Sequence, residues 1–363
     1  MKPTYQRVGG IRVSHTAIAA AAPRFVRGVA VFGMLLGGVS ARAEPAPPAS
    51  EVLPTATSTA DLVELGRTRL YADDPKGAQV VLHEALARSD VDADTATYLL
   101  GMAYEWSGDP AQALRLYEDG LARWPTSPLT PDRRYRRAEA FAALGHPREA
   151  LDALDALDTS GLSEDDLRKV ELAEGTFWLD LGRTRRGLRL LRDGLKGALK
   201  PVNPWSQARA RAALARKLAR EAAKLDFQTG QRRQRRHVAE RAQLVLRIEK
   251  EVTAIADLKQ PHWILDGVLT LGQTYESLAS DLAHGRVPHR LTDDQARLYA
   301  QEIGKRVKTL QLKALRTYDL GLRMAVRLGL HDPLVAPIRR HREALAHDLD
   351  VPVEPEPYRE RGP

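Results

Sequence analysis

The chain has 363 residues, of which 43% are hydrophobic and only 6% aromatic, a composition that suits packed helices better than a β-sandwich. It contains no cysteine, which excludes disulfides, thiol catalysis and thiolate metal sites. Its net charge of +8 comes mostly from six basic residues in an acid-free stretch of the first 43, so a generally basic, nucleic-acid-binding surface is not expected.

Residues 1–43 have the pattern of a cleaved signal peptide. Gly28–Ser40 is an uncharged run preceded by Arg24 and Arg27, and a small-x-small cleavage site ends at Ala43. As a helix this run spans about 20 Å, less than the roughly 30 Å needed to cross a bilayer. We expect an exported protein, periplasmic or secreted after cleavage; an uncleaved anchor and a mis-assigned start are the alternatives. Residues 44–59 are rich in Pro and Ala and predict a flexible linker.

Residues 60–199 carry pairs of small residues at a regular spacing. The two members of each pair are 12 residues apart, and the first members follow one another at intervals of 35, 37 and 37 residues. The pairs are Gly66 and Ala78, Gly101 and Ala113, Ala138 and Ala150, and Gly175 and Gly187. A constant gap with variable connections is expected of stacked helical hairpins, in which small residues lie where two helices cross.

The second pair lies in a stretch that resembles a tetratricopeptide (TPR) unit. The family pattern W-x2-L-G-x2-Y, A-x3-F, P is matched except at the leading Trp, where Thr97 stands. The matching residues are Leu100, Gly101, Tyr104, Ala113, Tyr117 and Pro125. The resemblance implies four helix–turn–helix units over residues 60–199, in a family that binds other proteins. We therefore predict an all-α, TPR-type helical-hairpin solenoid.

Residues 200–350 predict a C-terminal extension of longer helices. Helices are expected over 205–227, 232–258, 261–283, about 291–328 and 332–347. Gly272 and Tyr275, with Ala314 and Tyr318, indicate a degenerate TPR-like hairpin whose halves are parted by an insertion. Residues 351–363, rich in Pro and Glu, predict a disordered tail.

The stretch 239–330 is similar to a segment of exported myxobacterial TPR proteins, which include components of the adventurous gliding-motility machinery. The similarity is carried by Trp263, Leu271–Glu276, Val287, Pro288, Tyr299, Lys313, Ala314 and Tyr318. It implies an envelope scaffold protein without enzymatic activity. The Arg-rich segment around residue 232 departs from that pattern.

The first helix of each predicted unit should line a concave groove. Counting from the small residue, the candidate partner-binding positions are Arg67, Tyr71, Tyr98, Met102, Glu105, Trp106, Tyr135 and Glu139. Exposed aromatic side chains and a Met in a groove suit an apolar or extended peptide. The alternative, left open here, is that Tyr98 and Trp106 contact the neighbouring unit instead.

Charge is unevenly distributed along the chain. Residues 44–170 hold 23 acidic and 13 basic residues, whereas residues 209–241 hold 11 basic and three acidic ones. The basic block includes a cluster formed by Arg232, Arg233, Arg235 and Arg236. One interpretation is a binding site for an anionic polysaccharide, lipid headgroup or nucleic acid. The other is a solvated helix face that packs on the acidic half of the chain.

The sequence contains none of the motifs H-E-x-x-H, G-x-S-x-G and G-x-x-x-x-G-K-[ST], and its ten histidines are dispersed. We therefore expect no enzymatic activity, cofactor or metal. The predicted function is a protein–protein interaction scaffold or adaptor of a bacterial envelope complex. The alternatives are an anion-binding protein that uses the Arg232–Arg236 cluster and an accessory domain of an enzyme.

Overall fold

The computed structural model describes residues 58–72, 74–88, 92–196, 203–289, 291–330 and 332–351. The expected signal peptide, nearly all of the linker and the tail from residue 352 lie outside the described residues. Within the described ranges all regular structure is helical, in thirteen helices numbered α3 to α15, and no strand occurs. No described helix is both long and apolar enough to cross a membrane.

The first eight helices pair into four hairpins. In each, a first helix ends in a short turn and the second helix packs back against it. The pairs are α3 (Thr59–Tyr71) with α4 (Pro75–Leu86), α5 (Ala93–Ser107) with α6 (Pro110–Arg123), α7 (Thr130–Ala143) with α8 (Pro147–Asp155), and α9 (Glu164–Asp180) with α10 (Thr184–Gly194). Three of the second helices begin with proline, whose fixed φ and missing N–H suit the first helical position.

The predicted small residues lie at the helix crossings. A Cβ placed on Gly101 would lie 2.5 Å from Cε1 of Tyr117, and one placed on Gly175 would lie 2.8 Å from Cδ2 of Leu191. In the third hairpin, Ala138 and Ala150 are fully buried. These positions let the two helices approach closely because a larger side chain would displace the facing one.

The chain then continues in longer helices. These are α11 (Pro204–Ala223), α12 (Gln231–Asp257), α13 (Pro261–Ala283), α14 (Asp293–Leu328) and α15 (Val335–Asp348). Helix α11 pairs with α12 and α13 pairs with α14, while α15 packs on α14 and α13. A single apolar cluster runs through this part, from Ala208 on α11 to Ala346 on α15.

The α13–α14 pair repeats the packing of the α5–α6 pair. Gly272 faces the Tyr318 ring as Gly101 faces the Tyr117 ring. The Tyr117 hydroxyl donates to Glu105, four residues after Gly101, and the Tyr318 hydroxyl donates to the residue four after Gly272. The two halves of this hairpin are 46 residues apart, because α13 and α14 are much longer than α5 and α6.

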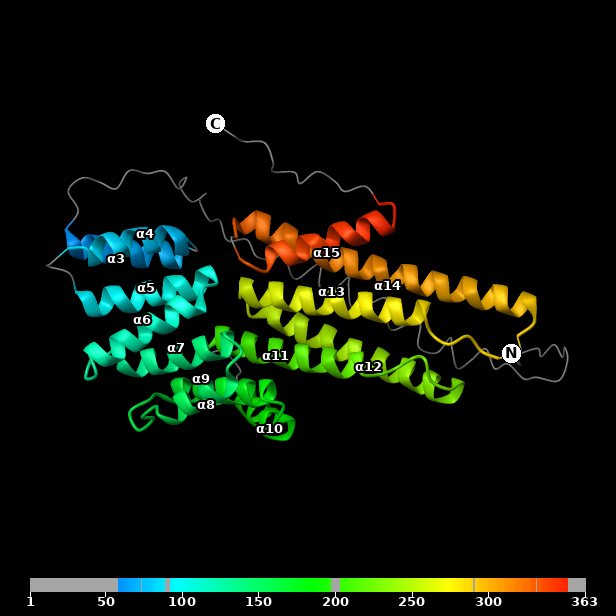
Figure 1. Ribbon diagram of the computed structural model, residues 1–363, viewed down its shortest axis with the longest axis horizontal. Helices are drawn as coiled ribbons and strands as arrows, with labels where there is room; N and C mark the ends of the chain where they lie inside the picture. The colour runs from blue at the N-terminus through cyan, green and yellow to red at the C-terminus, as the bar shows by residue number, and fades with distance from the viewer. Residues whose placement is uncertain are drawn as a thin grey trace, which may run out of the picture.

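The hairpins follow one another in space in the order of the chain (Figure 1). Helices α3 to α10 form one column, and α11 to α15 form a second column beside it. The two columns are in contact, because the end of α5 lies against the segment between α14 and α15. A Cβ placed on Gly108 would lie 3.4 Å from Cγ of Pro333. The protein is an all-α solenoid of helical hairpins with a C-terminal extension of longer helices.

Candidate functional site

Two of the predicted groove residues on α5 are buried. Tyr98 and Met102 are 8% and 4% exposed. Arg136 of α7 contacts Tyr98 and Glu105: its Nε donates to the Tyr98 hydroxyl at 3.1 Å, and its Nη1 lies 3.0 Å from Oε2 of Glu105. Glu105 also accepts the hydroxyl of Tyr117 at 2.8 Å. Tyr98 and Glu105 therefore hold α7 against α5.

The predicted groove residues on α7 are covered as well. Tyr135 and Glu139 are buried, and Glu139 pairs with Arg209 of α11. The Arg209 guanidinium lies 5.0 Å from the centre of the Phe177 ring, so it is enclosed by α7, α9 and α11. Burial raises the pKa of the Glu139 carboxyl, against the opposing effect of Arg209.

Tyr98, Met102, Tyr135 and Glu139 are thus buried, and the expectation that these side chains are exposed in a groove is wrong. For Tyr98 and Glu139 the physical reason is that long arginine side chains from later first helices bind them. A pocket of about 200 Å³ lies beside α7 and α9, and Tyr135 is among its lining residues.

Three of the remaining candidates are more accessible: Tyr71 is 67% exposed, and Arg67 and Trp106 are half-buried. The Glu105 side chain, held by Arg136 and Tyr117, is 13% exposed. The Trp106 ring lies edge-on to the Tyr71 ring at 6.1 Å, so it contacts the neighbouring hairpin.

The predicted basic cluster lies at the start of α12. Its members Arg232, Arg233, Arg235 and Arg236 are exposed, and no carboxylate of the described residues forms an ion pair with them. The rest of the basic block behaves differently, as Arg209 pairs with Glu139 of the acidic half. The expected packing on the acidic half therefore involves the start of the block, and not the Arg232–Arg236 cluster.

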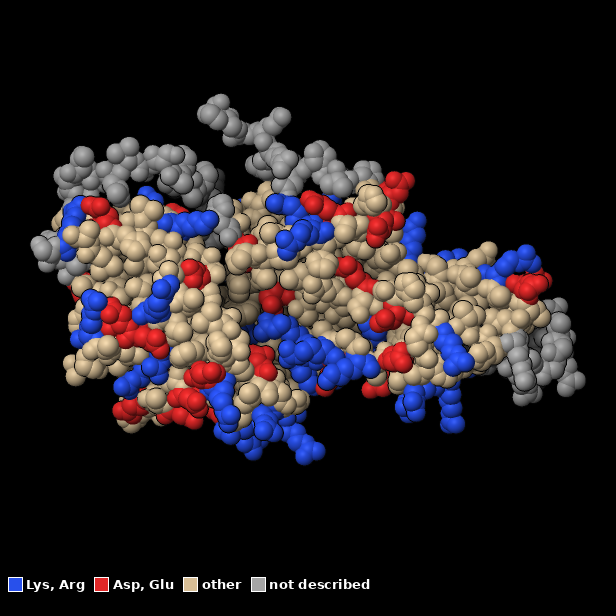
Figure 2. Space-filling view, in the orientation of Figure 1, with Lys and Arg blue, Asp and Glu red and all other residues tan. Residues whose placement is uncertain are grey.

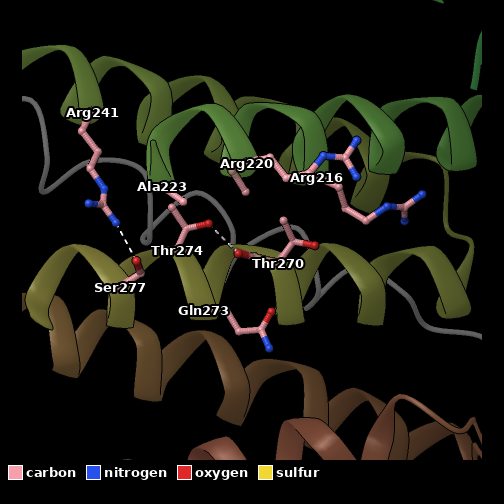
Figure 3. Close-up of a pocket in the computed structure, with 9 residues that line it drawn as sticks. Arg216, Arg220, Ala223, Arg241, Thr270, Gln273, Thr274 and Ser277 are labelled. Carbon is pink, nitrogen blue, oxygen red and sulfur yellow. Dashed lines mark hydrogen bonds between the residues drawn. The ribbon is translucent and has the colours of Figure 1, made fainter. Parts of the chain in front are cut away.

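A groove of about 340 Å³ lies between α11 and α13 and was not predicted (Figure 3). It is lined by Arg216, Ala219, Arg220, Ala223, Arg241, Thr270, Gln273, Thr274 and Ser277. We call this the α11/α13 groove. Its lining holds three arginines and no carboxylate. Basic side chains gather over α11 in the middle of the face drawn in Figure 2.

The three arginines are held by contacts at the edges of the groove. Arg241 is 1% exposed; it donates to the Ser277 hydroxyl at 2.6 Å and pairs with Asp281. Nη1 of Arg216 lies 2.7 Å from Oδ2 of Asp266. The Arg220 side chain is 54% exposed, with its Nη2 3.9 Å from Asp180. One guanidinium is thus fixed in the wall, while the other two extend from α11 beside the groove (Figure 3).

The sequence contained a signal for this groove. Gln273 and Ser277 stand one and five residues after Gly272, the same offsets that place Met102 and Trp106 after Gly101. Extending the groove count to the degenerate hairpin would have selected both residues. The arginines come from α11 and α12, where no small-residue anchor had been assigned, so the count could not reach them.

No group of three or more potential metal-ligating side chains is found in the described part of the chain. Neither a family model nor a curated protein sequence matches the protein. Among solved structures it is similar to a circular tandem repeat protein with novel repeat topology and enhanced subunit contact surfaces. That likeness covers 80% of this chain and 70% of the other, at 15% identity and a TM-score of 0.22. The fold assignment therefore relies on the helices of this chain themselves.

Proposed function

We propose that the protein is a non-enzymatic scaffold of the TPR type, exported to the bacterial envelope, where it holds a segment of a partner protein. The observation that carries this proposal is the α11/α13 groove. It lies between the first helices of two successive hairpins, where TPR-type solenoids present their binding residues. The TPR assignment is supported by the Gly101–Tyr117 packing and its repetition at Gly272 and Tyr318.

The proposal places the binding site differently from the groove positions chosen from the sequence. Of those positions, Tyr98 on α5 is bound by Arg136 and Glu139 on α7 is bound by Arg209. Between α11 and α13 the equivalent surface remains hollow, since Ala219 and Ala223 have side chains too short to fill it. A partner segment can enter there without displacing buried side chains.

The test is affinity capture from an envelope extract with the full mature chain and two tryptophan variants. Ala223 is exposed and lines the groove, so Ala223→Trp should fill it with little effect on the fold. Ala300 is exposed on α14 and is absent from the lining, so Ala300→Trp is the matched control. Proteins captured by the wild type and the control, but lost with Ala223→Trp, would support the proposal. An identical set from all three forms would contradict it.

A second candidate function is anion binding by the Arg232–Arg236 cluster. The observation that favours it is that these four arginines are exposed and form no ion pair with a described carboxylate. It predicts binding to an anionic polysaccharide or lipid that weakens steeply with salt. That binding should disappear when the four arginines are changed to glutamine, and should be unaffected by Ala223→Trp.

A further inference from the structure

We propose that the α11/α13 groove recognises an extended acidic peptide, with carboxylates two residues apart facing Arg216 and Arg220. This inference deepens the proposed function and depends on it, because it states the chemistry of the partner segment. It is drawn from the charge, the spacing and the size of the groove.

The charge of the lining is one-sided. Three guanidinium groups border the groove, while their carboxylate partners Asp180, Asp266 and Asp281 are not among the lining residues. A guanidinium has five N–H donors, and a carboxylate at one edge uses only some of them. Arg220 is held least, at 3.9 Å from its partner and with 54% of its side chain exposed. Donors thus remain for a second, incoming carboxylate.

The spacing of the arginines suits an extended chain. Arg216 and Arg220 are one helical turn apart, a rise of about 6 Å along α11. In an extended peptide, alternate side chains point to the same side and are separated by about 6.6 Å. Carboxylates at positions i and i+2 would therefore face the two guanidinium groups. The lining residues extend from Arg216 to Ala223 on α11 and from Thr270 to Ser277 on α13. Each stretch is seven residue steps, or about 10 Å along the helix.

That length matches roughly three residues of extended peptide. On the opposite wall, α13 contributes the hydroxyl-bearing side chains Thr270, Thr274 and Ser277. The Gln273 side chain points away from α11 (Figure 3), and its Nε2 lies 3.0 Å from Nε2 of His341. Arg241 is fixed by Ser277 and Asp281 and forms one end of the groove. The groove therefore has cationic side chains at defined positions and space for the backbone over the alanines of α11.

The test uses two fluorescently labelled ten-residue peptides, one repeating Glu-Ala and the other repeating Gln-Ala. Binding to the mature chain is measured by fluorescence anisotropy. The Glu peptide should bind at least about tenfold more tightly than the Gln peptide, as charge-assisted hydrogen bonds to two arginines would give. Ala223→Glu adds a carboxylate to the groove without removing an ion pair and should weaken binding by a similar factor. Ala300→Glu should leave it unchanged.

Three outcomes would overturn the inference. The first is equal binding of the two peptides, and the second is loss of binding with the Arg232–Arg236 glutamine variant but not with Ala223→Glu. The third is binding only after removal of residues 352–363, which contain Glu354 and Glu356; the chain's own tail would then be the occupant. If the peptides bind equally while Ala223→Trp still abolishes partner capture, the acidic specificity fails and the proposed function stands. If Ala223→Trp captures the same partners as the wild type, the proposed function fails.

Discussion

Substituting Gly101 by alanine tests whether close helix crossings hold the hairpins together. The added methyl would lie 2.5 Å from Cε1 of Tyr117, whereas carbon atoms in good contact are about 3.5–4.0 Å apart. The Tyr117 ring is fully buried, and its hydroxyl is bonded to Glu105 at 2.8 Å. The ring therefore has little freedom to move away, and α5 and α6 must separate.

Overpacking of this kind costs typically about 1–3 kcal/mol. Alanine is a better helix former than glycine by about 0.5–1 kcal/mol, which offsets part of the cost. We expect Gly101→Ala to destabilise the protein by about 1–2 kcal/mol net. Gly304 provides the matched control, since it lies inside α14 and a Cβ added to it would have no neighbouring atom within 4 Å. Gly304→Ala should stabilise the chain by about 0.5–1 kcal/mol, because only the propensity gain applies.

The assay is urea denaturation followed by circular dichroism at the helix band, combined with amide hydrogen exchange. Hydrogen exchange is needed because each hairpin of a solenoid contacts mainly its neighbours. A local loss of stability therefore need not shift the denaturation curve of the whole chain. Faster exchange in α5 and α6 for Gly101→Ala, and none for the control, is the expected result. If Gly101→Ala is as stable as Gly304→Ala, the close-crossing explanation of the fold is refuted.

Burial, titration and the leader sequence give three further predictions. Tyr98→Ala should lower the free energy of unfolding by about 3–5 kcal/mol, because the residue is only 8% exposed. Tyr71 is 67% exposed, so Tyr71→Ala should change the free energy of unfolding by less than about 0.5 kcal/mol in the same denaturation assay. Burial raises the pKa of Glu139 above its ordinary value of 4.5, so the folded protein binds this proton more tightly than the unfolded chain does. The free energy of unfolding of the wild type should accordingly fall relative to Glu139→Gln as pH rises above 4.5, and a difference independent of pH would contradict this. N-terminal sequencing of the envelope fraction should find a mature chain starting at Glu44; a chain starting at Met1 would show that the leader is retained.

The hairpins could be predicted from the sequence because their packing is local. Gly101 and Tyr117 are 16 residues apart, and the small residue, the aromatic and the turn between them all stand in one short stretch. The N-cap of α9 is local as well, since the Ser163 hydroxyl accepts from the N–H of Asp166, three residues away, at 3.2 Å. Such features depend on neighbouring residues in a helix, and periodicity makes them visible.

The candidate site could not be predicted in the same way, because it depends on contacts between distant residues. Arg209 reaches Glu139 over 70 residues, and Arg136 reaches Tyr98 over 38. Nothing in the spacing of α5 or α7 indicates that these side chains will fill the first-helix surface. Whether such a surface is open is decided by the next helix, and this is why the α11/α13 groove could not be located from the spacing of small residues.

Site-specific photo-crosslinking is the most direct test of the claim that a partner protein binds in the α11/α13 groove. A photoreactive amino acid at Ala219, inside the α11/α13 groove, is compared in cells with the same amino acid at Ala300, on the exposed surface of α14. We predict that Ala219 yields a discrete adduct with a partner protein and that Ala300 does not. Identical adducts from both positions, or none from Ala219 while partners are still captured by the wild-type chain, would contradict the assignment of the binding site to this groove.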